Sequence, residues 1–209
     1  MASKIVSILQ EIVKVLEEKK AELNRLDANL GDGDHGRTVV NAFRNVIEQN
    51  KDLEYKDLGD ALQKIGRTLA FSTGAATGPL FGSAFMEAGK RVQGKEKLTL
   101  RDWKNALSGA VEGVKKRGKA EVGDKTMLDT LYPAVKALEQ SVDKNESLKE
   151  GLLKAIEAAK KGMESTKDLI SRRGRSSRLG ERTIGHIDPG AASSYYILQT
   201  IIKNCLEEE

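Results

Sequence analysis

Apolar residues recur every three or four positions along most of the chain, which is the period of an amphipathic α-helix. In the first segment they fall on one helical face, with Lys and Glu opposite: Ile5, Ile8, Leu9, Ile12, Val13 and Leu16. The same pattern predicts four helices in the first half of the chain: one ending near Leu23, one from about Gly36 to Gln49, one marked by Leu58, Leu62, Ile65 and Leu69, and one reaching about Val92.

Helix-start signals place four further helices in the second half. Thr99–Asp102 and Ser147–Glu150 have the Ser/Thr-x-x-acid form of a capping box, in which side chain and backbone satisfy each other's N–H groups. They open helices predicted to reach about Lys116 and about Ile170. Asp124 is the expected N-cap of a helix reaching about Ser141, and a last helix is predicted from about Ala191 to Leu206.

Eight helices and no convincing strand predict an all-α fold, an eight-helix antiparallel up-and-down bundle formed by one domain over residues 1–209. The long irregular stretches fall at about 25–36, 71–82, 117–124 and 171–190. Each follows an odd-numbered helix, so in an up-and-down arrangement all four lie at the same end. We therefore expect them to form one site.

Composition narrows the class of protein. Of 209 residues, 35 are Lys or Arg and 31 are Asp or Glu, and the net charge of +4 is spread without a long basic block, which argues against nucleic-acid binding. No uncharged apolar run approaches the roughly 20 residues of a membrane span, and the N-terminus is too charged for a signal peptide. The single Cys205 fits a reducing compartment. We expect a soluble, cytoplasmic protein without membrane or nucleic-acid partners.

The first irregular stretch crowds carboxylates beside glycines. Asp27, Asp32 and Asp34 would repel one another unless a cation neutralises them, and oxygen-only ligands suit Mg²⁺ or Ca²⁺. Gly31 and Gly33 would let the backbone turn so that the three converge. The spacing is not that of an EF-hand. Taken singly, each Asp could instead cap a helix or turn, but the cluster favours a metal site.

The other stretches suggest anion binding. The small-residue run from Ser72 to Gly82 could present open backbone N–H groups, although it is not a Walker A loop and could serve only close helix packing. Five arginines between Arg172 and Arg182 could clamp phosphate or simply be solvated. His35 could orient a phosphate, act as an acid or base, or cap the second helix. Asp188 could be no more than a helix cap. Jointly, the stretches indicate a Mg²⁺–nucleotide or Mg²⁺–polyphosphate site.

Four motifs, LDANLGDGDHG, TGPLFGSAF, VGDKTMLDTLYPA and GRSSRLGERTIGHIDPGAAS, together resemble the ADP-binding L subunits of dihydroxyacetone kinases. The resemblance covers nearly the whole chain in order. It implies an eight-helix antiparallel barrel with ADP or ATP at one end. A chain of this length resembles the stand-alone subunit of the phosphotransferase-system-dependent enzymes, in which bound ADP is kept as a coenzyme.

The resemblance also assigns residues. It implies two Mg²⁺ ions on Asp27, Asp32 and Asp34, with Arg175 completing the group that aligns the phosphoryl transfer. The implied ADP-binding residues are His35, Gly36, Arg37, Thr38, Ala76, Thr77, Gly118, Met127, Arg175, Asp188, Pro189 and Gly190. The base for the acceptor hydroxyl is expected on a partner, so neither His35 nor His186 is assigned that role.

The partners implied by the resemblance are a phosphohistidine phosphotransferase subunit, which phosphorylates the bound ADP, and a dihydroxyacetone-binding subunit, which receives the phosphoryl group. A transcriptional regulator and a second copy of the chain are further candidates. The chain departs from the family pattern at Ala75, Thr77, Arg37 and Val39. Alternative functions are a kinase component for another small ketose or a fatty acid, an ADP-dependent regulatory module, and a helical bundle whose acidic loop holds a structural cation.

Overall fold

A computed structural model of the chain describes residues 2–50 and 54–207, and within these ranges the secondary structure consists of eight α-helices and two 3₁₀ segments. The helices are α1 (Ala2–Ala28), α2 (His35–Asn50), α3 (Leu58–Phe71), α4 (Thr77–Arg91), α5 (Leu100–Gly118), α6 (Leu128–Asp143), α7 (Leu148–Ser165) and α8 (Pro189–Leu206). Two 3₁₀ segments, η1 (Thr166–Asp168) and η2 (Arg175–Thr183), lie between α7 and α8. The expected all-α, eight-helix fold is confirmed.

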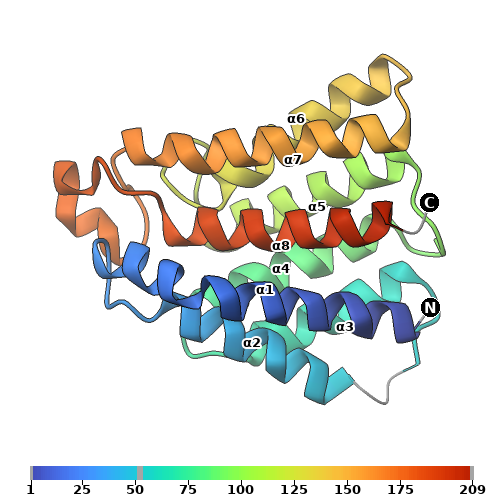
Figure 1. The fold of residues 1–209 in the computed structure, drawn as a ribbon, viewed down its shortest axis with the longest axis horizontal. Helices are drawn as coiled ribbons and strands as arrows, with labels where there is room; N and C mark the ends of the chain where they lie inside the picture. The colour runs from blue at the N-terminus through green and yellow to red at the C-terminus, as the bar shows by residue number, and fades with distance from the viewer. Residues whose placement is uncertain (1, 51–53, 208–209) are drawn as a thin grey trace.

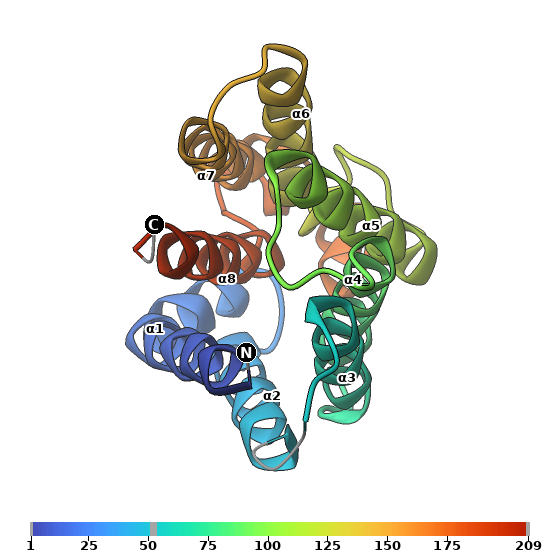
Figure 2. The same ribbon diagram turned by 90° about the vertical axis from the view of Figure 1, so that its right-hand side faces the viewer.

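The eight helices form a closed ring. Each one packs against its neighbour in the sequence, and α8 packs against α1, so that the last helix closes the barrel (Figure 2). Successive helices run in opposite directions, and both chain ends lie at the right-hand end in Figure 1. The connections after α1, α3, α5 and α7 gather at the left-hand end of that view, as the parity of the helices predicts.

The apolar faces of the helices meet inside the ring. Phe43 of α2 is fully buried and makes edge-to-face contacts with Phe81 and Phe85 of α4. The helices α3 and α4 approach each other through glycines, because a Cβ at Gly66 would lie 2.7 Å from the carbonyl oxygen of Gly82. Within the described residues, no helix combines the length and apolar character that a membrane crossing requires.

Several helix boundaries differ from those predicted, including the start of α4 at Thr77, inside the stretch 71–82 that was expected to be irregular. The helix α1 continues past Leu23 to Ala28, so Asp27 lies in its last helical turn rather than in a loop. The helix α7 ends at Ser165 instead of Ile170, and η1 follows it. The last helix begins at Pro189, before Ala191, since Asp188 accepts the N–H of Ala191 and Pro suits the first helical position.

The predicted N-cap at Asp124 is wrong. Its carboxylate accepts the N–H of Glu121 and pairs with Arg173, while α6 begins only at Leu128. The carboxylate of Asp129 instead accepts the N–H groups of Gly123 and Thr126, at 2.5 and 2.7 Å. A carboxylate in the first helical turn can accept N–H groups of residues that come before the helix. A search limited to residues preceding the helix does not find such a contact. The capping boxes at Thr99 and Ser147 are confirmed.

Candidate functional site

The acidic turn between α1 and α2 holds three carboxylates together. Asp27 comes from the last turn of α1, and one oxygen from each of Asp27, Asp32 and Asp34 lies within 4.8 Å of the others. Asp27 Oδ2 accepts the backbone N–H groups of Asp34 and His35, at 2.9 and 3.2 Å, and so fixes the start of α2 against the end of α1. The turn depends on Gly33, whose φ of +76° lies in the left-handed region.

Arginine side chains face these carboxylates. Arg175, at the start of η2, pairs with Asp32, and Arg37 pairs with Asp34 at 3.3 Å. The hydrogen bond from Arg175 lowers the pKa of Asp32 below its usual value. Arg175, in the connection between α7 and α8, therefore contacts Asp32, in the connection between α1 and α2, although the two residues are 143 positions apart in the sequence. The side chains of both arginines are about two-thirds exposed, so each is accessible to a further anionic partner.

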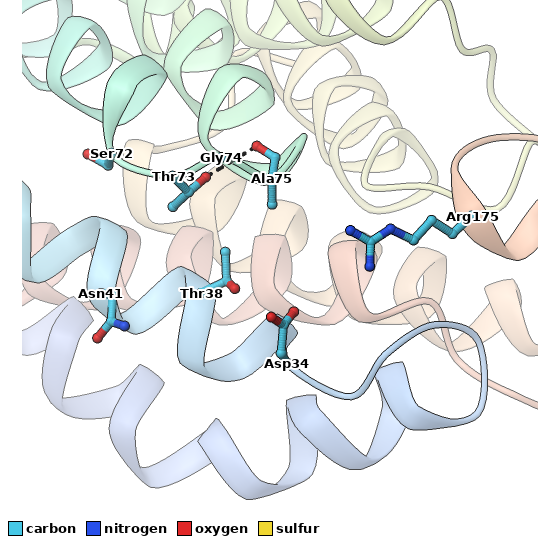
Figure 3. Close-up of a pocket in the computed structure, with 8 residues that line it drawn as sticks. All are labelled: Asp34, Thr38, Asn41, Ser72, Thr73, Gly74, Ala75 and Arg175. Atoms are coloured by element: carbon cyan, nitrogen blue, oxygen red, sulfur yellow. Dashed lines mark hydrogen bonds between the residues drawn. The ribbon is translucent and has the colours of Figure 1, made fainter.

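A polar cavity of about 380 Å³ opens beside the acidic turn (Figure 3). Its walls come from three parts of the chain: α2, the α3–α4 connection and η2. The lining residues are Asp34, Thr38, Asn41, Ser72, Thr73, Gly74, Ala75 and Arg175. In Figure 3 the guanidinium group of Arg175 extends toward the space between Asp34 and Ala75. The cavity lies in the size range of small-molecule sites.

The small-residue stretch contributes differently from the expectation. Residues 72–75 line the cavity, whereas Ala76 and Thr77 do not; Ala76 precedes α4 and Thr77 begins it. Gly74 has open space where a Cβ would stand, so packing does not explain it, while Gly82 packs tightly against α3. Helix packing thus accounts for the end of the stretch, and its beginning faces the cavity.

His35 connects the acidic turn to α8. Its Nε2 lies 2.9 Å from Ser193 Oγ, and Asp27 accepts its backbone N–H. Burial lowers the pKa of His35, with the nearby carboxylates of Asp27 and Asp34 opposing the shift. The ring is therefore held neutral more readily than an exposed histidine. Gly36 is buried where a Cβ would meet the carbonyl oxygen of Lys20, at 2.4 Å, so α1 and α2 touch at this point.

The remaining predicted residues lie at the same end of the barrel but outside the cavity. Gly118 ends α5, and Met127 is buried immediately before α6. Gly190, in the first turn of α8, has its Cβ position 3.9 Å from the Met127 nitrogen and 3.0 Å from Asp188 Oδ2. The starts of α6 and α8 therefore adjoin each other. Pro189 is buried beside them.

Two residues of this end escaped the sequence analysis. Asn41 lines the cavity together with Thr38 and lies about one helical turn after it on α2. Extending the helical period from Thr38 would therefore have identified Asn41. Lys125 is 1% exposed and bonds to backbone carbonyl groups far away in the sequence. Nothing in its neighbourhood along the chain signals those contacts.

The donor set of the acidic turn suits a hard divalent cation. All three side chains offer oxygen, and Mg²⁺ commonly uses a few carboxylates and completes its shell with phosphate and water. A Cβ at residue 31 would lie 2.7 Å from Asp27 Oδ1, so glycine at this position keeps that oxygen approachable. The residues present therefore fit such an ion.

Comparison with known proteins identifies a family to which the chain is similar. The model of the DAK2 domain matches residues 29–203. The ADP-binding subunit of the PEP-dependent dihydroxyacetone kinase of Escherichia coli is 39% identical over 199 residues, covering 95% of each chain. That of the PTS-dependent dihydroxyacetone kinase of Lactococcus lactis is 36% identical over 191 residues, covering 90% of each.

A solved structure shares the fold. The dihydroxyacetone kinase of C. freundii, in complex with AMP-PNP and Mg²⁺, superposes with a TM-score of 0.69 and 28% sequence identity. The match covers 95% of this chain and 33% of that one, so the chain spans about a third of the larger kinase.

Proposed function

The chain belongs to the DAK2 domain family, and from this premise we propose that it is the ADP-binding subunit of a dihydroxyacetone kinase. The observation that carries the proposal is the acidic turn, with Asp27, Asp32 and Asp34 within 4.8 Å of one another, beside a polar cavity that Asp34 and Arg175 both line. Near-full-length similarity to stand-alone ADP-binding subunits supports the one-domain organisation and the assignment together.

The proposal gives the three aspartates the task of holding two Mg²⁺ ions. Such ions neutralise phosphate oxygens and align them for transfer. Asp27 is fixed by the N–H groups of Asp34 and His35, so its free oxygen has a defined direction. Arg175 and Arg37 pair with the carboxylates of Asp32 and Asp34 and so offset part of the clustered negative charge of the turn.

Arg175 would move from Asp32 toward phosphate oxygens when the cations take over the carboxylates. Its planar guanidinium group can donate two parallel hydrogen bonds to a phosphoryl group. Thr38 and the backbone of residues 73–75 line the same cavity and offer donors from two further sides. The cavity therefore has acceptors for cations at one wall and donors for anions at the others.

The nucleotide is proposed to lie with its phosphates in this cavity and the rest of the molecule toward the starts of α6 and α8. Met127 and Gly190 adjoin there, and Gly118 lies at the end of α5 on the same side of the barrel. The side chain of Met127 is buried there, whereas Gly118 and Gly190 are partly exposed, so the purine ring would lie against glycine backbone. The related C. freundii kinase in complex with AMP-PNP and Mg²⁺ supports this ligand class.

The acceptor would be bound by a partner protein. Among the described residues that line the cavity, the one carboxylate that could serve as a base for a hydroxyl group is that of Asp34, which is already assigned to cations. A retained ADP that is phosphorylated by a phosphohistidine protein and then phosphorylates dihydroxyacetone on a second subunit fits this arrangement, and PTS dependence is stated in the name of the Lactococcus relative.

The rim of the cavity end carries exposed apolar side chains. Phe71 is 90% exposed directly before the cavity-lining Ser72, and Ile184, Val122 and Ile170 are each more than a third exposed in the neighbouring connections. Phe71 is the most exposed of them and adjoins the cavity-lining residues in sequence, so it is the proposed anchor for a protein contact. We propose that the partner subunits dock on this rim.

Native mass spectrometry of the freshly purified protein, without added nucleotide, tests the proposal. We expect an added mass of one ADP and two Mg²⁺, lost in Asp32→Asn and kept in Asp143→Asn, whose exposed carboxylate lies at the opposite end of α6. A bare chain that also takes up no ADP with excess Mg²⁺ would refute the nucleotide assignment. Weak, reversible uptake would instead indicate an exchanging, ATP-dependent component.

A further inference from the structure

Lys125 is a buried ammonium group with an unusual set of partners. It lies in the α5–α6 connection, is 1% exposed, and its Nζ is within hydrogen-bond distance of four backbone carbonyl oxygens. These belong to Thr166 at 2.7 Å, Leu169 at 3.1 Å, Thr183 at 2.7 Å and His186 at 2.6 Å. All four partners are acceptors, so the group is held as the protonated ammonium ion with its three N–H donors shared among them.

The four carbonyl groups belong to the two stems of one loop. Thr166 and Leu169 precede η2, Thr183 is its last residue, and His186 follows it. Arg175 lies between the stems, at the start of η2, where it pairs with Asp32. One ammonium ion thus fastens both ends of the segment that carries Arg175 to the cavity.

Neighbouring contacts strengthen the same junction. The backbone carbonyl oxygen of Asp124 accepts the N–H of Arg172, and the Asp124 carboxylate pairs with Arg173 at 2.9 Å. Across the stems, Thr183 Oγ1 accepts the N–H of Ser171 at 2.9 Å. The dipeptide Asp124–Lys125 is therefore the point at which the Arg175 loop is attached to the barrel.

The backbone conformation and the burial of Lys125 both cost free energy, which a residue that served only to pack the interior would not require. Lys125 has a φ of +61°, a left-handed conformation that side-chain-bearing residues rarely adopt. Burial of a charged group is also unfavourable, and apolar residues commonly serve stability as well or better. A buried ion with directed hydrogen bonds, however, selects one loop geometry among several compact ones. The free-energy cost of Lys125 therefore indicates that this residue selects the geometry of the loop.

We propose that Lys125 is a positioning residue: its ammonium ion joins the two stems of the 169–183 loop and thereby places the Arg175 guanidinium group over the cavity. The role in phosphoryl transfer rests on the proposed function above, whereas the control of loop geometry does not. The chemistry of Lys125 is electrostatic and structural, and the residue itself does not contact the nucleotide.

The first test is hydrogen–deuterium exchange on the free protein. Lys125→Met removes the donors and retains most of the side-chain volume. We expect amide exchange in residues 169–186 to rise about tenfold or more, with α1 to α3 unchanged. The control is Leu152→Ala, a fully buried site on α7 near the opposite end, which should loosen the fold without singling out this loop. Equal acceleration throughout the barrel in Lys125→Met would overturn the proposal.

The second test is a double-mutant cycle on ADP affinity in the presence of Mg²⁺. Arg175→Ala and Lys125→Met should each weaken binding, by about 10- to 100-fold for a displaced contact. If Lys125 acts through Arg175, the double variant is no weaker than Arg175→Ala alone. Additive losses would show that Lys125 does not act through Arg175 and would overturn the proposal.

A third variant keeps both tests decisive if Lys125→Met fails to fold. Lys125→Gln leaves a shorter, neutral amide that reaches fewer of the four carbonyl groups, and we expect the same localised exchange to a smaller degree. The wild-type chain is measured for ADP binding first. If it binds none, the proposed function fails, and the exchange pattern still decides whether Lys125 controls the loop.

Discussion

Asp188 shows how one side chain at the site end combines a structural and an electrostatic role. Its carboxylate accepts the N–H of Ala191 and so caps α8. Withdrawal from water raises its pKa from 3.8 to about 7, against the hydrogen bond from Ala191 and the charge of Lys125, which both lower it. Below that pKa the folded protein holds a proton on Asp188, whereas the unfolded chain releases it near pH 4.

This difference gives stability a dependence on pH. Between about pH 4 and about pH 7 the folded state binds more protons at Asp188 than the unfolded state, so the free energy of unfolding falls as pH rises. The shift of about three units corresponds to about 4 kcal/mol over the whole window. Above about pH 8 both states are ionised and the dependence ends.

Asp188→Asn isolates this contribution, because asparagine keeps the cap and does not titrate. We expect the variant to gain stability relative to the wild type as pH rises from about 4 to about 7, and to hold that gain at higher pH. Urea denaturation of both proteins without nucleotide, at several pH values, measures the difference. Parallel stability curves across the whole range would contradict the raised pKa.

Among the secondary-structure elements, helix starts with reciprocal caps could be read directly from the sequence. At Thr99, the side chain accepts the N–H of Asp102, and the Asp102 carboxylate accepts from the backbone N–H and hydroxyl of Thr99. The Thr99 hydroxyl holds the pKa of Asp102 below its usual value. All these contacts lie within four residues, so the local motif determines them.

Thr99→Ala should therefore destabilise the protein by about 1 kcal/mol, the usual cost of losing a cap. For a domain of this size the melting temperature should fall by about 2–4 °C. Thr99→Ser keeps the hydroxyl and is the matched control, with stability close to that of the wild type. Thermal unfolding followed by circular dichroism measures both. Equal melting temperatures for the alanine and serine variants would show that the box contributes nothing.

Other element boundaries depended on contacts that the local sequence does not specify. The helix α1 continues to Ala28 because the backbone oxygen of Asp27 accepts N–H groups from the turn while its carboxylate fixes the start of α2. Asp124 resembles an N-cap in sequence, but Arg173, 49 residues later, takes its carboxylate. The acid cluster and the two capping boxes were therefore predictable, and the partner of Asp124 was not.

At the scale of the whole molecule, the end of the barrel that carries the candidate site followed from the order of the helices. Because successive helices run in opposite directions, the connections after α1, α3, α5 and α7 lie at one end, as they do in the structure (Figure 1). The contacts that join these connections could not be predicted from the sequence. Lys125 bonds to carbonyl groups 41 to 61 residues away, and no side-chain pattern marks a carbonyl partner. Parity therefore predicts where the connections gather, and only the folded chain reveals what attaches them to one another.

The same end of the barrel has to meet other proteins if the acceptor lies on a partner, and the proposed docking surface is its rim of exposed apolar side chains. Phe71→Asp should raise the partner concentration needed for half-maximal phosphoryl transfer by at least about tenfold, since an exposed aromatic anchor carries much of a protein interface's binding energy. ADP binding should be unchanged, because Phe71 does not line the cavity.

Leu153→Asp is the matched control: Leu153 is 49% exposed on α7, outside the connections at the site end, and should leave transfer as it is. Steady-state transfer at varied partner concentration, with ADP affinity measured in parallel, separates docking from nucleotide binding. If both variants behave like the wild type, the partner approaches the bound phosphates from another side of the rim, and the exposed position of Phe71 has a different cause.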